Sequence, residues 1–372
     1  MNSLFSGAIS APEDSIVVHV ESGRVHVPDP SFAFRGDYAK EGQDLIIEND
    51  DGQILRVVDY FTYAFPPELV APNGGVVRGA DAQRLAGVSD DMHLAQAQGA
   101  GVQLAERTLE NAIGQVEAFD GQVTVTRSDG STVALGDGDL VFQNDVVATG
   151  PDSSLSLTFV DGTIFSLSAS SRMILDELIY DPGGDDNSAV FNLVEGAFIF
   201  ITGAVAPSGG MDIQTPAGVI GIRGTTVEVQ ILATDGVAEV LMSLLLDTDG
   251  SSGEVELFDL DGNLIAVVTN TDTSWIISPV EGETREVPRA AADQANDPVL
   301  QAQAIAALQS ANARVANGDT YVSQERTSGG GNPGDQVLPD TPVAPGETPE
   351  EENGGSEDGG GQGGSEETQG EE

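Results

Sequence analysis

The feature that most constrains the fold is a short turn signal, Asp-Gly or Gly-Gly, that recurs between residues 114 and 287. It separates short runs in which apolar and polar residues alternate, such as QVTVTR, SLSLTFV and AVFNLV. Alternation with a period of two is typical of strands with one buried face, and glycine accepts the positive φ of a tight hairpin. The turn dipeptides are Asp120-Gly121, Asp129-Gly130, Asp137-Gly138, Asp161-Gly162, Gly183-Gly184, Asp235-Gly236, Asp249-Gly250 and Asp261-Gly262.

Helical periodicity is nearly absent between residues 113 and 287, so a parallel sheet with helical crossovers is excluded. We therefore predict an all-β domain here, built as a sandwich, a barrel or a β-solenoid. The expected core residues are the apolar members of these strands: Leu155, Leu157, Phe159, Ile164, Phe165, Leu167, Leu193, Phe198 and Phe200.

A smaller β module is predicted over residues 15–70, after a flexible N-terminus at 1–14. Asp51-Gly52 lies between two apolar runs, a strong hairpin signal. His19 and His26 would lie on opposite faces if residues 15–27 formed one continuous strand. Residues 71–112 are rich in Ala, Gly and Gln, which favours a linker or a short frayed helix.

A helix is predicted within residues 288–318. Asp297 is the candidate N-cap, Pro298 fits the first helical position, and Gly318 fits the end. Residues 319–372 are rich in Gly, Pro and Glu and almost without apolar side chains, so we expect an acidic, disordered tail. The apolar stripe expected to dock the helix on a sheet consists of Val299, Ala302, Ile305, Leu308 and Val315.

Charge and composition exclude several classes of function. The chain carries 61 acidic residues against 14 Lys and Arg, a formal net charge of −47. Such a surface repels nucleic acid and anionic lipid, so we expect neither as a partner. Cysteine is absent, which excludes thiol catalysis and thiolate metal sites. No apolar run approaches the ~20 residues of a membrane-spanning helix, and the N-terminus lacks the pattern of a Sec signal peptide.

The glycines of IQTPAGVIGIRGTTVEV, residues 213–229, could suggest a phosphate-binding loop. They are spaced G-x-x-G-x-x-G, however, and a strand-like run follows them where such a loop needs the N-terminus of a helix. A structural role is favoured, with the Arg223 guanidinium held by a carboxylate. No G-x-S-x-G motif occurs either, so we predict no catalytic residues and no enzyme activity.

Calcium is the one metal ion for which the sequence offers candidate ligands. Residues 247–254 and 259–263 cluster oxygen ligands, but neither segment completes an EF-hand loop. Asp-Gly turns explain both segments, so no cofactor or metal residue is predicted and weak Ca²⁺ binding stays open.

A running pattern of glycines and alternating apolar residues occupies four segments: Asp145–Gly150, Ser154–Thr163, Phe191–Gly203 and Thr215–Thr225. This pattern resembles that of the FecR domain. Two departures occur: Asn144 stands where the family has glycine, and Pro216-Ala217-Gly218 stands where it has proline, any residue and alanine. The resemblance implies a twisted, solenoid-like β fold in which the signature residues are structural. They are Asp145, Gly150, Asp161, Gly162, Thr163, Glu195, Gly196, Gly203, Thr215, Pro216, Gly221, Ile222, Arg223, Gly224 and Thr225.

The FecR resemblance also implies a signalling role, because well-known members relay signals from outer-membrane transporters to sigma factors in Gram-negative bacteria. Those members carry an anti-sigma helical segment and one transmembrane helix, neither of which is expected here. Residues 36–61 resemble the prefix-like retention module of biofilm adhesins secreted by type I systems, whose substrates are typically acidic and poor in lysine.

Two hypotheses for function follow. The first is a non-enzymatic envelope or surface protein that acts by protein–protein interaction as an adhesin-type retention module, exported by a type I route. Outer-membrane or secretion components are the partners expected for it. The alternative is a FecR-like scaffold that couples an envelope signal to transcription, in the periplasm or the cytoplasm.

Overall fold

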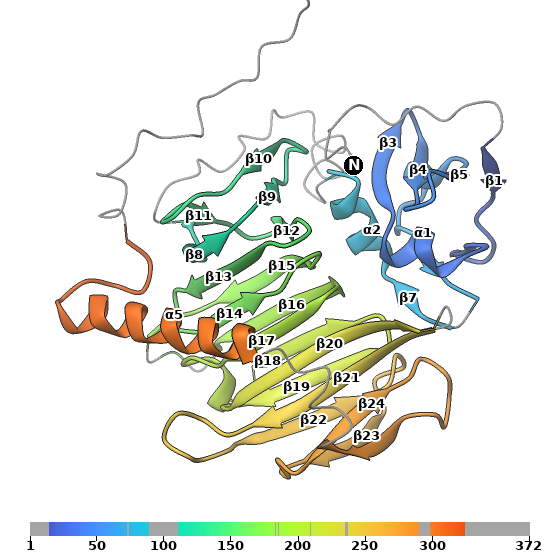
Figure 1. Ribbon diagram of the computed structural model, residues 1–372. Helices are drawn as coiled ribbons and strands as arrows, with labels where there is room; N and C mark the ends of the chain where they lie inside the picture. The colour runs from blue at the N-terminus through green and yellow to red at the C-terminus, as the bar shows by residue number, and fades with distance from the viewer. Residues whose placement is uncertain are drawn as a thin grey trace, which may run out of the picture. The chain divides into compact units, whose positions relative to one another are not determined.

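The computed structural model describes residues 15–72, 74–88, 111–182, 184, 186–208, 210–234, 237–289 and 298–323. Strands are the main secondary structure, and two open nine-stranded sheets contain all the strands of residues 114–288 (Figure 1). The predicted all-β, sandwich-like fold is confirmed, and the sheets do not close into a barrel.

The first sheet has the order β10-β9-β12-β15-β16-β18-β19-β22-β23. Its pairs are antiparallel except β16 and β18, which run parallel. The strands are β9 (Val123–Thr126), β10 (Thr132–Ala134), β12 (Val146–Thr149), β15 (Arg172–Ile179), β16 (Ser188–Glu195), β18 (Met211–Thr215), β19 (Gly218–Arg223), β22 (Glu254–Phe258) and β23 (Leu264–Val268).

The second sheet has the order β11-β8-β13-β14-β17-β20-β21-β24-β25, and all its pairs are antiparallel. The chain moves repeatedly from one sheet to the other, as when it passes from β16 in the first sheet to β17 in the second and back to β18 in the first. The strands are β8 (Gly114–Asp120), β11 (Leu140–Val141), β13 (Ser154–Phe159), β14 (Ile164–Leu167), β17 (Ala197–Ile201), β20 (Thr226–Thr234), β21 (Val237–Leu245), β24 (Thr273–Ile277) and β25 (Arg285–Pro288).

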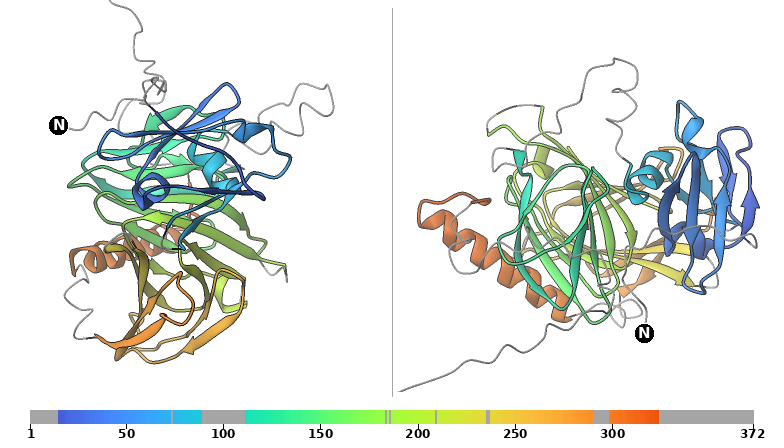
Figure 2. Two further views of the ribbon diagram at one scale, coloured as in Figure 1. Left: turned by 90° about the vertical axis from the view of Figure 1, so that its right-hand side faces the viewer. Right: turned by 90° about the horizontal axis from the view of Figure 1, so that it is seen from above.

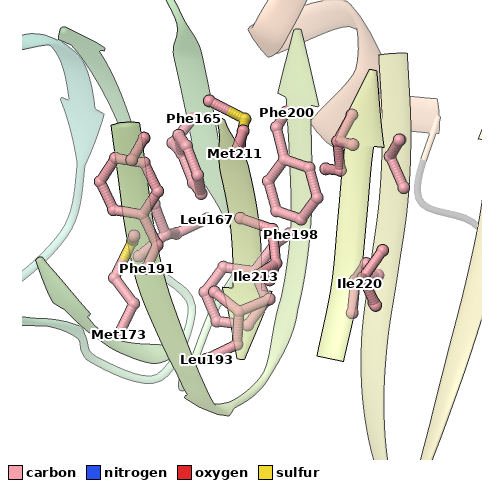
Figure 3. Close-up of a cluster of buried hydrophobic side chains, with 14 of the residues drawn as sticks. Phe165, Leu167, Met173, Phe191, Leu193, Phe198, Phe200, Met211, Ile213 and Ile220 are labelled. Carbon is pink, nitrogen blue, oxygen red and sulfur yellow. The ribbon is translucent and has the colours of Figure 1, made fainter. Parts of the chain in front are cut away.

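The inner faces of the two sheets enclose one continuous hydrophobic core. Its centre is aromatic: the Phe165 ring lies 4.7 Å from the rings of both Phe191 and Phe200, and 5.4 Å from that of Phe159, between centroids (Figure 3). All nine predicted core residues are buried. Ile164 differs from the other eight, because it points to the opposite face of its sheet and packs beneath the C-terminal helix.

That helix, α5 (Pro298–Ala316), lies against β13, β14 and β17, as Figure 2 also shows. The helix begins at Pro298 and ends shortly before Gly318, as the sequence predicted, while Asp297, the expected N-cap, lies outside the described residues. Of the predicted docking stripe, only Leu308 packs against the sheet. Val299, Ile305 and Val315 are exposed, and the buried face is formed by Leu300, Ala304, Ala307 and Ala311. Alanines have little to bury by themselves, but they let the helix axis approach the sheet closely, so the sheet's own Ile164 and Ile199 supply the apolar contact.

A buried ion pair also holds α5 in place. The Arg314 guanidinium lies 2.5 Å from a Glu117 carboxylate oxygen on β8, and it donates a second hydrogen bond to the Tyr321 carbonyl. Thr158 donates to the same Glu117 oxygen. Polar partners therefore satisfy a carboxylate that is 1% exposed.

Residues 15–88 form a second hydrophobic cluster, to which Ala238 of β21 also belongs. The predicted hairpin is confirmed, since β4 and β5 pair in antiparallel register around the turn. The elements are β1 (Ile16–Val18), β2 (Arg24–His26), α1 (Pro30–Phe34), β3 (Asp37–Glu41), β4 (Asp44–Glu48), β5 (Ile54–Val57), η1 (Tyr60–Thr62), β6 (Glu68–Val70), β7 (Val76–Val77) and α2 (Gly79–Leu85).

Two expectations for this region need correction. Residues 15–27 are not one strand, because a turn at Ser22-Gly23 sends β1 to pair with β5 and β2 to pair with β6. The segment after residue 70 does not begin as a linker, since β7 and α2 pack into the cluster through Val77 and Ala82. Residues 1–14, 89–110 and 324–372, with the predicted tail, lie outside the described residues.

Candidate protein-interaction site

The start of the FecR-like pattern is anchored by Asp145, which is 1% exposed. Its carboxylate lies 2.5 Å from the guanidinium of Arg127 and also accepts a hydrogen bond from the Phe142 backbone N–H. The preceding Asn144 has φ +67, a left-handed conformation that glycine adopts freely and that asparagine tolerates better than most residues. The geometry thus accounts for glycine in the family pattern and for asparagine as its replacement here.

The Asp161-Gly162-Thr163 turn is fastened to the end of β17. Asp161 accepts hydrogen bonds from both the backbone N–H and the hydroxyl of Thr163, and Thr163 accepts one from the Gly203 N–H at 2.9 Å. A Cβ at Gly203 would lie 2.4 Å from the Asp161 carbonyl oxygen, so only glycine fits this approach. Signature residues that lie far apart in the sequence therefore meet here, and their hydrogen bonds stabilise the turn.

The run Thr215–Gly218 forms the hairpin between β18 and β19. The Thr215 hydroxyl donates to the Gly218 carbonyl and accepts from the N–H groups of Ala217 and Gly218, which closes a two-residue turn at Pro216-Ala217. A Cβ at Gly218 would lie 2.3 Å from the Phe258 carbonyl oxygen. Glycine, the residue that departs from the family pattern, is therefore required here by the closeness of β22.

The remaining signature residues also sit in turns or strands. Ile222 is a core residue, while Arg223 on the outer face lies 2.5 Å from the Glu256 carboxylate, as the sequence suggested. Thr225 exchanges two hydrogen bonds with the Thr202 hydroxyl. Gly150, Gly162, Gly196 and Gly224 lie in the connections between strands. The signature residues thus stabilise several separate turns and strands, and they do not converge on one chemical site.

Glu195, at the end of β16, is the signature residue with a perturbed acidity. Burial raises its pKa above the ordinary 4.5, and the nearby Arg172 guanidinium opposes that shift. When the pKa of a carboxyl group is higher in the folded than in the unfolded state, ionisation of that group destabilises the folded state. The free energy of unfolding is therefore lower above the folded-state pKa of Glu195 than below pH 4.5.

We expect Glu195→Gln to raise the thermal unfolding midpoint at pH 7 and to leave it unchanged near about pH 3, where the glutamate is protonated in both states. Thermal unfolding followed by circular dichroism at the two pH values measures this difference. The exposed Glu281→Gln is the matched control and should show no such difference. Destabilisation by Glu195→Gln at neutral pH would mean that the Arg172 attraction outweighs burial.

Gly221 has a different role from the other signature glycines. A Cβ here would meet Asp212 and Phe258 at an ordinary 3.5 Å, so neither a clash nor a positive φ demands glycine. It lines a hollow of about 310 Å³ together with Asp212, Arg223, Glu256 and Phe258. Partial desolvation raises the pKa of Asp212, and Arg223 opposes this. The outer face of β18, β19 and β22 is thus hollowed and mainly acidic.

Next to this face lies β23, the last strand of the first sheet. Leu264, Ile265 and Val267 are 54%, 38% and 48% exposed, although all three are large and apolar. These three residues were not predicted as part of a site from the sequence. The available signal was the run LIAVV, which lacks the polar alternation of the other strands although it follows a turn at Asp261-Gly262.

The described residues contain no cluster of His, Cys, Asp or Glu arranged to hold a metal ion. In the segment that raised the calcium question, the Asp259 carboxylate accepts hydrogen bonds from the N–H groups of Asp261 and Asn263, as in a polar turn. No helix within the described ranges is long and apolar enough to cross a membrane.

A comparison with known protein families finds a match for part of the chain. The FecR protein family model matches residues 145–243, which run from β12 into β21 across both sheets. This segment is therefore similar to FecR proteins, and β8–β11 and β22–β25 extend the same two sheets. No curated protein matches the chain.

Among solved structures, two crystal structures of a candidate anti-sigma factor from Parabacteroides distasonis ATCC 8503 are similar, at 16% identity and a TM-score of 0.29. The similarity covers 38% of this chain and 59% of that one, which is less than two thirds of its length. Likeness this low adds nothing to the fold assignment.

Proposed function

We propose that this chain is a non-enzymatic scaffold of the FecR type, which binds other proteins and couples a signal in the cell envelope to transcription. The observation that carries the proposal is the FecR match over residues 145–243. The site supports it, because the signature residues serve as turn locks and the described surface offers a broad sheet face with an exposed apolar edge.

Gene deletion in the native cells, followed by transcript profiling, tests this role. A confined set of transcripts should change, and the full chain supplied from a plasmid should restore it. Unchanged transcription, measured under conditions in which the protein is present, would overturn the signalling proposal.

The retention role predicted from residues 36–61 stays a prediction, since none of the matches reported above concerns an adhesin. Protease treatment of intact cells, with a biofilm assay on the deletion strain, separates the two roles. Surface cleavage and biofilm loss without a transcriptional change would favour retention. Protection from protease together with the transcriptional change is expected for the scaffold.

A further inference from the structure

The open sheets leave several edge strands, and most of these are protected. β25 carries Arg285, Glu286 and Pro288, which discourage pairing by charge and by a missing N–H. β3 is charged as well, and β1, β7, β10 and β11 have three residues or fewer. β23 is the longest edge strand among the described residues that is apolar at every position.

No strand in the described part of the chain pairs with the free edge of β23, and Ile265 lines a hollow of about 580 Å³ together with residues of β2, β6, β7 and the loop after β24. The strand pairs only with β22, so the N–H and C=O groups on its other side face away from the sheet. Backbone groups of this kind together with exposed Leu264, Ile265 and Val267 provide what an added strand needs: main-chain hydrogen bonds and apolar side-chain contacts.

The charge around this edge limits what can bind there. From residue 254 to residue 272 the chain carries no Lys, Arg or His, and its acidic residues are Glu254, Glu256, Asp259, Asp261 and Asp272. The hollow lined by Ile265 holds Arg24 and Arg78 against the acidic Glu68, Asp259, Asp261 and Glu281, and Arg223 pairs with Glu256, so acidic side chains remain in excess around this edge. Glu256 pairs in register with Val267, and Asp212 lies two strands further along the same row. Like charges brought together at an interface are unfavourable, so an acidic strand is disfavoured and a basic one is attracted.

We propose that β23 receives an extended segment of a protein partner, with apolar and basic residues alternating, as an added antiparallel strand. Apolar side chains of that segment would cover Ile265 and Val267, and its Lys or Arg side chains would meet the acidic residues beside them. A second copy of this chain is disfavoured as the occupant, because two chains of net charge −47 would bring acidic edges together. This inference rests on the proposed protein-binding function and names the partner chemistry.

Photo-crosslinking in native cells tests it on the full chain. A benzoylphenylalanine residue replaces Ile265 in one strain and Leu246, which is also exposed and apolar, in the control strain. The cross-linked segment is then mapped by mass spectrometry. We expect cross-links from position 265 that are absent at position 246, in a segment of another protein with alternating apolar residues and a net positive charge.

Charge variants provide the second arm. Adding Val267→Lys to the position-265 strain should abolish the cross-link, because it places a cation on the edge that a basic strand would cover. Val299→Lys, on the exposed side of α5, adds the same charge elsewhere and should leave the cross-link intact. A cross-link within this chain or to a second copy, a mapped segment that is neutral or acidic, or a yield no higher than at position 246 would overturn the inference.

The two proposals fail separately. A cross-link of the expected kind, with no transcriptional change on gene deletion, would support β23 as a docking edge and contradict the signalling role. A transcriptional change that Val267→Lys does not affect, with no specific cross-link, would keep the scaffold and remove this edge from it.

Discussion

Replacing Asp145 by alanine is expected to lower the free energy of unfolding by about 3–5 kcal/mol, as when one partner of a buried ion pair is removed. Arg127, whose side chain is 10% exposed, would keep its charge without the carboxylate 2.5 Å away. The Phe142 N–H would lose its acceptor as well. Urea or guanidinium unfolding of the two proteins measures the difference.

Two controls show whether burial is the cause. Glu68→Ala removes one partner of the Arg24–Glu68 pair, in which the side chains are 60% and 40% exposed, and should change stability by less than about 1 kcal/mol. The double variant Arg127→Met/Asp145→Ala should recover part of the lost free energy of unfolding, since it also removes the buried Arg127 charge that the single variant leaves without Asp145. A loss at Asp145 no larger than that at Glu68 would contradict the prediction.

Replacing Phe165 by alanine is expected to destabilise the chain by about 3–5 kcal/mol, the usual range for deleting a buried aromatic side chain. The ring is fully buried and contacts three other phenylalanine rings between the two sheets. A sandwich held from both sides relaxes little into such a cavity, so the loss should lie in the upper part of this range. Chemical unfolding measures it.

Phe65→Ala is the matched control, because that ring is 87% exposed. Its removal should change stability by no more than about 0.5 kcal/mol, as for surface substitutions generally. Equal effects at the two positions would show that Phe165 does not lie at the centre of the core.

Many features of the fold could be predicted from local sequence. The β4–β5 hairpin follows from Asp51-Gly52 between two apolar runs, and the bounds of α5 follow from Pro298 and Gly318. Turn dipeptides and strand alternation depend on neighbouring residues only, so the chain's own backbone preferences are sufficient for them.

The face by which α5 docks could not be predicted in the same way. Hydrophobicity favours Val299, Ile305 and Val315, yet Ala304, Ala307 and Ala311 are buried. Which face of a helix is covered depends on the shape of the surface beneath it, here strands with Ile164 and Ile199 pointing outward. Those strands lie roughly a hundred residues or more earlier in the chain, out of reach of any local pattern.

The candidate docking edge was missed for a related reason. LIAVV is as apolar as a central strand, and its sequence does not show whether one neighbour or two will lie beside it. Only the strand order of the complete sheet places β23 last and leaves Ile265 and Val267 exposed.

The sequence by itself determined the all-β class, the position of the turns and the FecR signature, since these depend on local conformation and on residue types at fixed spacing. The tertiary structure decided which signature residues meet, as Thr163 meets Gly203, and which strand forms the open edge. The physical reason is that pairing order between distant strands is settled by the packing of the whole core, and no short segment carries that information.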